Sequence, residues 1–242
     1  MPRLFERISL TLVIALACVA PALAQARLEI DETTFNFGYI PQTGKVAHSY
    51  VMRSKGTDSL KILSVKPGCG CTKAPIKKEV VAPGDSTAVE LIFTSAESYR
   101  GEVQKSATVT CNDDARGTFM LRFKATLNTF PDSAKPAQLS PWGVGYAAAN
   151  RNSETSITIK NVSTEPLNLA FVSYPQEFIN VTLPSGDIAP GKSATIKVKV
   201  SPTCTEKEFE KSFTFTTGSS PDAQRYTVPV VLGNSATETS AH

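Results

Sequence analysis

The sequence has little of the side-chain chemistry on which most enzymes depend. It contains two histidines in 242 residues, and one of them is the last residue, His242. It has no G-x-S-x-G and no H-E-x-x-H motif, so a Ser-His-Asp arrangement would have to be built around His48 alone. We expect His48 to occupy an ordinary strand position. These absences predict a protein that is not an enzyme.

An excess of one charge and a long apolar run beyond the N-terminus are also missing. The formal net charge is +3, which leaves no basic footprint for nucleic acid. After the first 24 residues, no apolar segment is long enough to span a bilayer. The sequence therefore predicts neither a nucleic-acid partner nor a transmembrane segment.

Residues 1–24 have the three-part pattern of a secretory signal peptide. Two early arginines are followed by an apolar run over residues 10–20, and the A-x-A sequence Ala-Leu-Ala precedes Gln25. We expect a mature protein that begins at Gln25 and is exported to the periplasm or the extracellular space. In the alternative, Cys18 is the lipid-modified first residue of a membrane-anchored lipoprotein.

An internal repeat organises the mature chain. Residues 79–93 align with residues 186–200 at an offset of 107, with the same Ala-Pro-Gly turn in both copies. At this offset residues 50–65 align with 157–172, and a one-residue change of register extends the match. The repeat predicts two related modules, each about 100 residues long as in immunoglobulin-like sandwiches. The mature chain is then divided into four parts: module one (25–128), a proline-containing linker (129–138), module two (139–233) and a flexible tail (234–242).

Period-two alternation predicts strands in both modules. In residues 86–93, Val89, Leu91 and Phe93 share one face, which we expect to be buried. Residues 193–200 repeat this pattern, with apolar residues facing inward and two lysines facing water. Short strands separated by proline-glycine turns predict an all-β fold of tandem immunoglobulin-like β-sandwiches.

Three motifs in module one carry a family resemblance. They are Phe35-Asn36-Phe37-Gly38, Cys69-Gly70-Cys71-Thr72 and Pro83-Gly84-Asp85. In this order they resemble a family of bacterial exported proteins catalogued as a domain of unknown function, which is similar to the ASH and MSP-like immunoglobulin folds. The resemblance implies modules that bind other proteins and have no known catalytic role. Module two has no cysteine pair, so any function of the cysteines belongs to module one.

Four cysteines remain after removal of the signal peptide: Cys69, Cys71, Cys111 and Cys204. Direct pairing of Cys69 with Cys71 would close a very small ring, so we expect a structural disulfide from Cys111 to one of them. Unpaired thiols in a tight turn are the next interpretation. A soft ion such as Cu(I), held by the Cys69, Cys71 and Cys111 thiolates, is a further hypothesis, as is disulfide exchange. No cofactor is predicted.

The remaining polar and aromatic features have ordinary interpretations. The adjacent carboxylates Asp113 and Asp114 are expected to be solvated, and Trp142 is expected to pack in a core. The sequence as a whole predicts a non-catalytic, exported cell-envelope binding or scaffolding protein. Its partner would be an unknown envelope protein, bound at an open sheet edge. The alternative is a thiol-dependent periplasmic protein that binds copper or exchanges disulfides through Cys69 and Cys71.

Overall fold

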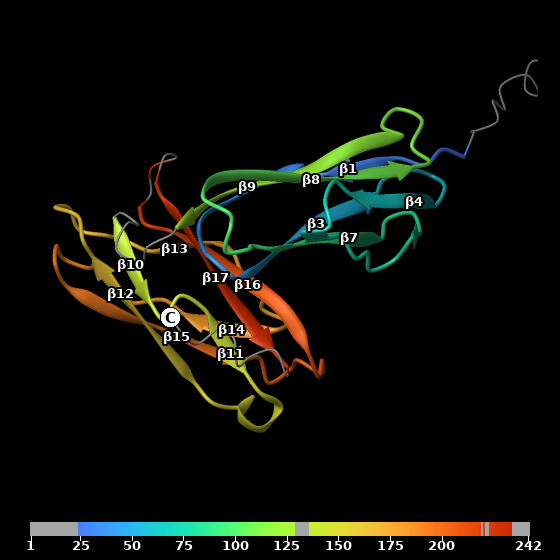
Figure 1. Ribbon diagram of the computed structural model, residues 1–242. Coiled ribbons are helices and arrows are strands. Elements are labelled where there is room, and N and C mark those ends of the chain that lie inside the picture. Colours follow the sequence, from blue (N-terminus) through green and yellow to red (C-terminus); the bar gives the residue numbers. More distant parts are fainter. Residues whose placement is uncertain (1–23, 129–135, 219, 221–222, 234–242) are drawn as a thin grey trace, which may run out of the picture.

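The computed structural model describes residues 24–128, 136–218, 220 and 223–233, and their regular structure is almost entirely β-strand (Figure 1). The strands of the first half are β1 (Leu28–Ile30), β2 (Thr34–Pro41), β3 (Lys45–Ser54), β4 (Leu60–Pro67), β5 (Thr72–Lys73), β6 (Val80–Val81), β7 (Ser86–Thr94), β8 (Gly101–Cys111) and β9 (Thr118–Asn128). Those of the second half are β10 (Ala137–Ser140), β11 (Val144–Tyr146), β12 (Thr155–Asn161), β13 (Ala170–Ser173), β14 (Ile179–Thr182), β15 (Ser193–Val200), β16 (Phe209–Thr216) and β17 (Arg225–Leu232), with one 3-10 turn at Ala148–Asn150.

Module one, formed by β1 to β9, is a sandwich of two sheets. One sheet has the order β1-β3-β7-β5, and the other runs from β2 through β9, β8 and β4 to β6. Their inner faces bury a single core whose largest side chains include Phe37, Tyr50, Leu91, Phe93 and Phe123. Val89, Leu91 and Phe93 are fully buried, so the alternation expected in β7 is confirmed.

Module two, formed by β10 to β17, repeats this arrangement with its own core. The sheet β10-β12-β15-β14 faces β13-β16-β17, and β11 adds to β17 in parallel as β2 adds to β9. The sequence offset of 107 holds at the level of single residue pairs. Leu60 pairs with Val81 in module one, and its counterpart Leu167 pairs with Ile188 in module two. The predicted all-β fold of tandem immunoglobulin-like sandwiches is confirmed.

The two sandwiches meet in one contact, which we call the seam. It is formed by β2, β3, β5, β7 and the loop after β5 in module one, and by β13, β16, β17 and the loop before β14 in module two. Strand β17 lies parallel to β2 at Tyr226 and Tyr39, so one nine-stranded sheet runs through both modules. At this point Gly38 has a φ of +66°, and a Cβ on it would lie 2.1 Å from the carbonyl oxygen of Arg225. Only glycine allows this approach of the two backbones. Figure 1 shows the lobes meeting where β16 and β17 reach module one.

Several predicted features lie outside the described residues. They are the signal peptide except for Ala24, the lipid-anchor candidate Cys18, residues 129–135 of the linker and the tail 234–242. Within the part of the chain that the structure describes, no helix has the length and apolar character needed to cross a membrane.

Candidate functional sites: the cysteine loop and the seam

The cysteine loop, residues 68–71, joins β4 to β5 and contains a disulfide between Cys69 and Cys71. The S–S distance is 2.04 Å and the two Cα atoms are 5.3 Å apart. This Cα separation lies within the usual range for disulfides, because the chain is sufficiently extended across the intervening Gly70. The predicted pairing of Cys111 with Cys69 or Cys71 is therefore wrong for this structure.

The strand register explains why Cys111 is excluded. In the antiparallel pair β4 and β8, Cys111 lies opposite Ile62, whereas Pro67, which leads into the cysteine loop, lies opposite Ala107. Cys111 is thus about five strand positions, or roughly 17 Å, from the cysteine loop. It can neither bridge to the loop nor complete a site of three thiolates there. In the described residues, no group of three or more histidine, cysteine or acidic side chains is placed to hold a metal ion.

The two remaining thiols are buried and unpaired with each other. The Cys111 thiol donates a hydrogen bond to the Arg116 carbonyl oxygen at 3.4 Å, and burial raises the pKa of this thiol. Cys204 is buried in the core of module two. Neither has the exposed, electropositive surroundings of a reactive cysteine.

The disulfide is held from both sides but remains partly exposed. Gly68 N–H donates to the Ser106 carbonyl, and Thr94 N–H donates to the Cys71 carbonyl. The buried Thr72 hydroxyl lies 3.5 Å from Cys69 Sγ and 3.9 Å from Cys71 Sγ. On the outer side, a Cβ added to Gly70 would have no atom within 4 Å. Both cysteines are therefore partly exposed, Cys71 also packs against the core of module one, and one hydroxyl lies close to both sulfurs.

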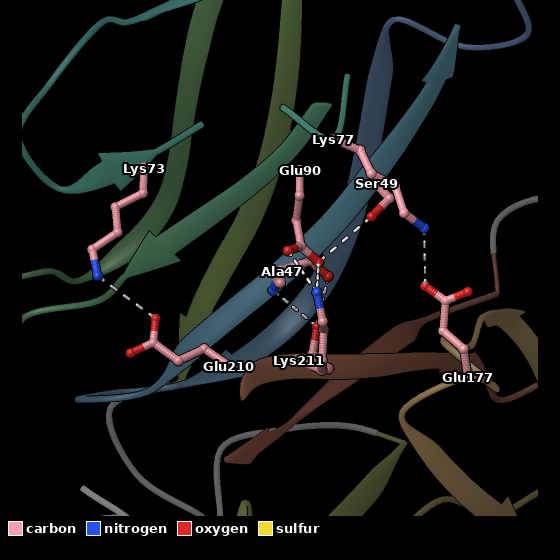
Figure 2. Close-up of polar contacts among 9 residues, drawn as sticks. Ala47, Ser49, Lys73, Lys77, Glu90, Glu177, Glu210 and Lys211 are labelled. Atoms are coloured by element: carbon pink, nitrogen blue, oxygen red, sulfur yellow. Dashed lines mark hydrogen bonds and ion pairs between the residues drawn. The ribbon is translucent and has the colours of Figure 1, made fainter. Parts of the chain in front are cut away.

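Ion pairs and hydrogen bonds line the seam (Figure 2). The Lys211 ammonium donates to both carboxylate oxygens of Glu90 at 2.6 Å, and their side chains are only 13% and 16% exposed. Next to this pair, the Ser212 hydroxyl donates to the Ala47 carbonyl and accepts from the Ala47 N–H. Three further pairs lie toward the rim. Figure 2 shows Lys73–Glu210 and Lys77–Glu177, and the third is Lys45–Glu210. The relative orientation of the modules is thus fixed by directional contacts as well as by apolar packing.

His48 belongs to the same seam. Its ring is buried on β3, stacks on Phe35 at a centroid distance of 3.6 Å, and contacts Glu32 Oε1 through Nε2 at 2.8 Å. Its Nδ1 is 3.3 Å from the hydroxyl of Ser173, which lies on module two. The position is in a strand, as expected, but the ring also bridges the modules. Nε2 thus faces the Glu32 carboxylate and Nδ1 faces the Ser173 hydroxyl, so each ring nitrogen has a hydrogen-bonding partner. We assign the contacts Ser173–His48–Glu32 to the seam, because Ser173 belongs to module two and Glu32 to module one.

Asp113 differs from its expected role as a solvated charge. Its carboxylate is buried and accepts hydrogen bonds from the backbone N–H groups of Leu28, Ala115 and Arg116. Burial opposes its charge, but these three donors together with nearby Arg27 outweigh that effect and hold the pKa of Asp113 below its ordinary value. The residue fixes the turn after β8 to the first strand of the chain, β1.

Strand β13 forms one end of the nine-stranded sheet in the part of the chain that the structure describes, where it pairs with β16 alone. Its side chains include Phe171 and Val172, which are 40% and 36% exposed. Phe171 stacks on Tyr174 with ring centroids 4.7 Å apart, so the aromatic surface continues past the strand end. The strand carries no charged residue, although charge is a common protection of exposed edges. It therefore offers backbone hydrogen-bonding groups next to apolar side chains.

The fold and these sites define a protein of two immunoglobulin-like modules, and comparisons with known families agree. Residues 28–127 match the family described as a protein of unknown function, DUF1573. Residues 144–229 match the HYDIN/CFA65/VesB-like, Ig-like domain. Both halves thus match immunoglobulin-like or uncharacterised families, and an Ig-like domain fits a non-catalytic role in protein interactions. No curated protein matches the chain.

Solved structures give distant likenesses. A protein of unknown function from Porphyromonas gingivalis W83 is 12% identical over 85% of this chain and 99% of its own, with a TM-score of 0.34. The CupB2 chaperone of Pseudomonas aeruginosa is 8% identical over 83% of this chain and 98% of its own, with a TM-score of 0.29. The Vibrio cholerae VesB protease is 19% identical over 43% of this chain and 32% of its own, with a TM-score of 0.31. At these TM-scores the likenesses carry no argument about function.

Proposed function

We propose that the protein is an exported, non-catalytic component of the cell envelope that binds or scaffolds other proteins. The observation that carries this proposal is the edge at β13, where the exposed Phe171 and Val172 lie on a strand that, among the described residues, pairs with β16 alone. Export is supported by the signal-peptide pattern of residues 1–24. The lipid-anchored form beginning at Cys18 is the alternative form of the same proposal.

The binding mode we propose is the addition of a partner strand to β13. Main-chain hydrogen bonds would give affinity, and the alternating side chains on either side would give specificity. Phe171 and Tyr174 supply an aromatic surface with little rotamer entropy to lose on binding. The hydrogen bond between Ser173 and His48 ties the end of β13 to module one.

A rigid seam supports a scaffolding role. If the modules moved independently, surfaces on the two halves would have no fixed spacing. The Lys211–Glu90 pair, the Ser212–Ala47 hydrogen bonds and the continuous sheet hold one relative orientation instead. Two partners bound on different modules would then be held at a defined distance.

The test is site-specific photo-crosslinking in the cell of origin. A photoreactive phenylalanine analogue at Val172 should give a discrete cross-linked protein. The same analogue at Lys160, an exposed position on the central strand β12, should not. Cell fractionation and N-terminal sequencing of the same samples should find an exported chain that begins at Gln25 or Cys18. A cytoplasmic chain, or equal cross-linking at both positions, would contradict the proposal.

A further inference from the structure

The Cys69–Cys71 disulfide has no evident part in holding module one together. It spans two residues in the sequence, and the loop around it is already fixed by backbone hydrogen bonds from Gly68 and Thr94. A cross-link that closes so short a loop removes little entropy from the unfolded chain. Cys71 packs against the core of module one, but the S–S bond itself adds little to the stability of the loop.

We propose that this disulfide is an exchange site for a thiol of a protein partner. The inference rests on the proposed function, since it supposes a protein partner, and it adds a covalent step to that contact. The partner class is a protein with an accessible cysteine thiol in an oxidising compartment. This identifies the cysteine loop as a second contact region, on module one, separate from β13.

The step is balanced without an added oxidant. The partner thiol loses its proton to water, and the thiolate attacks one of the two loop sulfurs. The Cys69–Cys71 bond breaks, an intermolecular S–S bond forms, and the other loop cysteine leaves as a thiolate that takes up a proton. One disulfide and one thiol become one mixed disulfide and one thiol, so the number of electrons is unchanged.

The surroundings favour the thiolate that leaves. The Thr72 hydroxyl is within 3.9 Å of both sulfurs, so it can donate a hydrogen bond to whichever cysteine is released. Among the described residues the other two cysteines, Cys111 and Cys204, are buried, so of the described cysteines those of the loop are the accessible ones while the protein is folded.

Access to the sulfurs comes from the outer side of the loop. Cys69 and Cys71 are partly exposed, and the space next to Gly70 is open. An attacking thiolate must approach along the S–S axis, which requires an unobstructed side. The hydrogen bonds of Gly68 and Thr94 lie on the strand side, so they can persist when the S–S bond opens.

The test uses the purified, oxidised mature chain with reduced glutathione as the thiol. Acid-quenched samples are analysed by intact-mass spectrometry and peptide mapping. We expect the folded protein to gain one glutathione, located at Cys69 or Cys71, together with one new free thiol. The variant with both Cys69→Ser and Cys71→Ser should gain none. Cys111→Ser, which removes a buried thiol, should react as the parent protein does.

Two valine variants, one at Thr72 and one at a control position, test the role of the Thr72 hydroxyl. Thr72→Val should slow adduct formation by about tenfold, because a hydrogen bond to a charged sulfur is lost. Thr214→Val removes a buried hydroxyl in module two and should leave the rate unchanged. Circular dichroism confirms that each variant is folded.

Two results would overturn the inference. One is an adduct that persists without Cys69 and Cys71. The other is a folded protein that gains no glutathione under conditions in which a disulfide-closed peptide of residues 67–73 does. Cross-linking at Val172 involves no cysteine, so a partner that is still captured by the double serine variant would leave the proposed function standing while the exchange site fails.

Discussion

The pair formed by Lys211 and Glu90 should contribute more to stability than any other ion pair of the seam. Both ends are largely shielded from water, and the ammonium also lies 4.2 Å from the centre of the Phe178 ring. Removing one partner of a buried pair costs about 3–5 kcal/mol, because the other charge is left without a partner. The remaining exposure lets water reach the orphaned charge, so we expect about 2–3 kcal/mol for Lys211→Met or Glu90→Gln.

The double variant is the informative one. Replacing both partners leaves no buried charge unpaired, so Lys211→Met with Glu90→Gln should be within about 1 kcal/mol of the parent protein. The exposed pair Lys78–Asp85, with an N–O distance of 2.8 Å, is the matched control. Replacing Lys78 by Met should produce no measurable change in the free energy of unfolding, because solvent screens exposed pairs.

Urea unfolding followed by two signals measures these effects. Trp142 is the single tryptophan and packs on the core of module two, so its emission reports that module, while circular dichroism reports both. In the single variants we expect the two midpoints to separate as the seam weakens. If the double variant loses as much stability as the two single variants combined, the charges do not interact across the seam and the reasoning is refuted.

Two other predictions follow from close contacts and from one perturbed carboxylate. Gly38→Ala should destabilise the protein by at least about 2 kcal/mol more than Gly84→Ala in thermal unfolding. Both glycines have positive φ, but only at Gly38 would a Cβ lie against the backbone of module two. Equal losses of stability in the two variants would contradict this. Because the folded pKa of Asp113 is depressed, its stabilisation is present above the unfolded value near 3.9 and is lost as the pH falls through the folded value. Asp113→Asn should therefore lower the unfolding midpoint at neutral pH and flatten its decline in acid; parallel pH profiles of variant and parent would argue against it.

The repeat made the fold predictable from the sequence, because it reports strand positions twice. Val89 and Ile196 occupy the same position in the two copies, and both are fully buried. Local alternation is enough to predict such faces, since the pleat alternates side chains between core and solvent. The register of neighbouring strands has no such local signal. The predicted disulfide from Cys111 to the cysteine loop was wrong, because the position of Cys111 relative to the loop depends on the register between β4 and β8.

The contacts of the seam were likewise beyond the reach of the sequence. Glu90 and Lys211 are 121 residues apart, and each has the character of an ordinary surface charge in an alternating strand. In the Ser173–His48–Glu32 contacts, Glu32 and His48 lie on different segments of module one, and Ser173 reaches His48 only when the modules dock. The motif Phe-x-Phe-Gly did contain a signal, because its glycine has the positive φ and the close approach that the seam requires.

The repeat also shows how one structural position serves different purposes in the two modules. At the offset of 107, the cysteine loop corresponds to residues 175–178, since β5 pairs with β7 at Thr72 as β14 pairs with β15 at Ile179. In module two this loop takes part in the seam: Glu177 approaches Lys77, and Phe178 lies under the Lys211 ammonium, while Gln176, the counterpart of Cys69, stays exposed. In module one the corresponding loop is exposed and carries the disulfide. The same loop position thus contributes contacts to the seam in module two and carries the disulfide in module one, at a place that the seam fixes relative to β13.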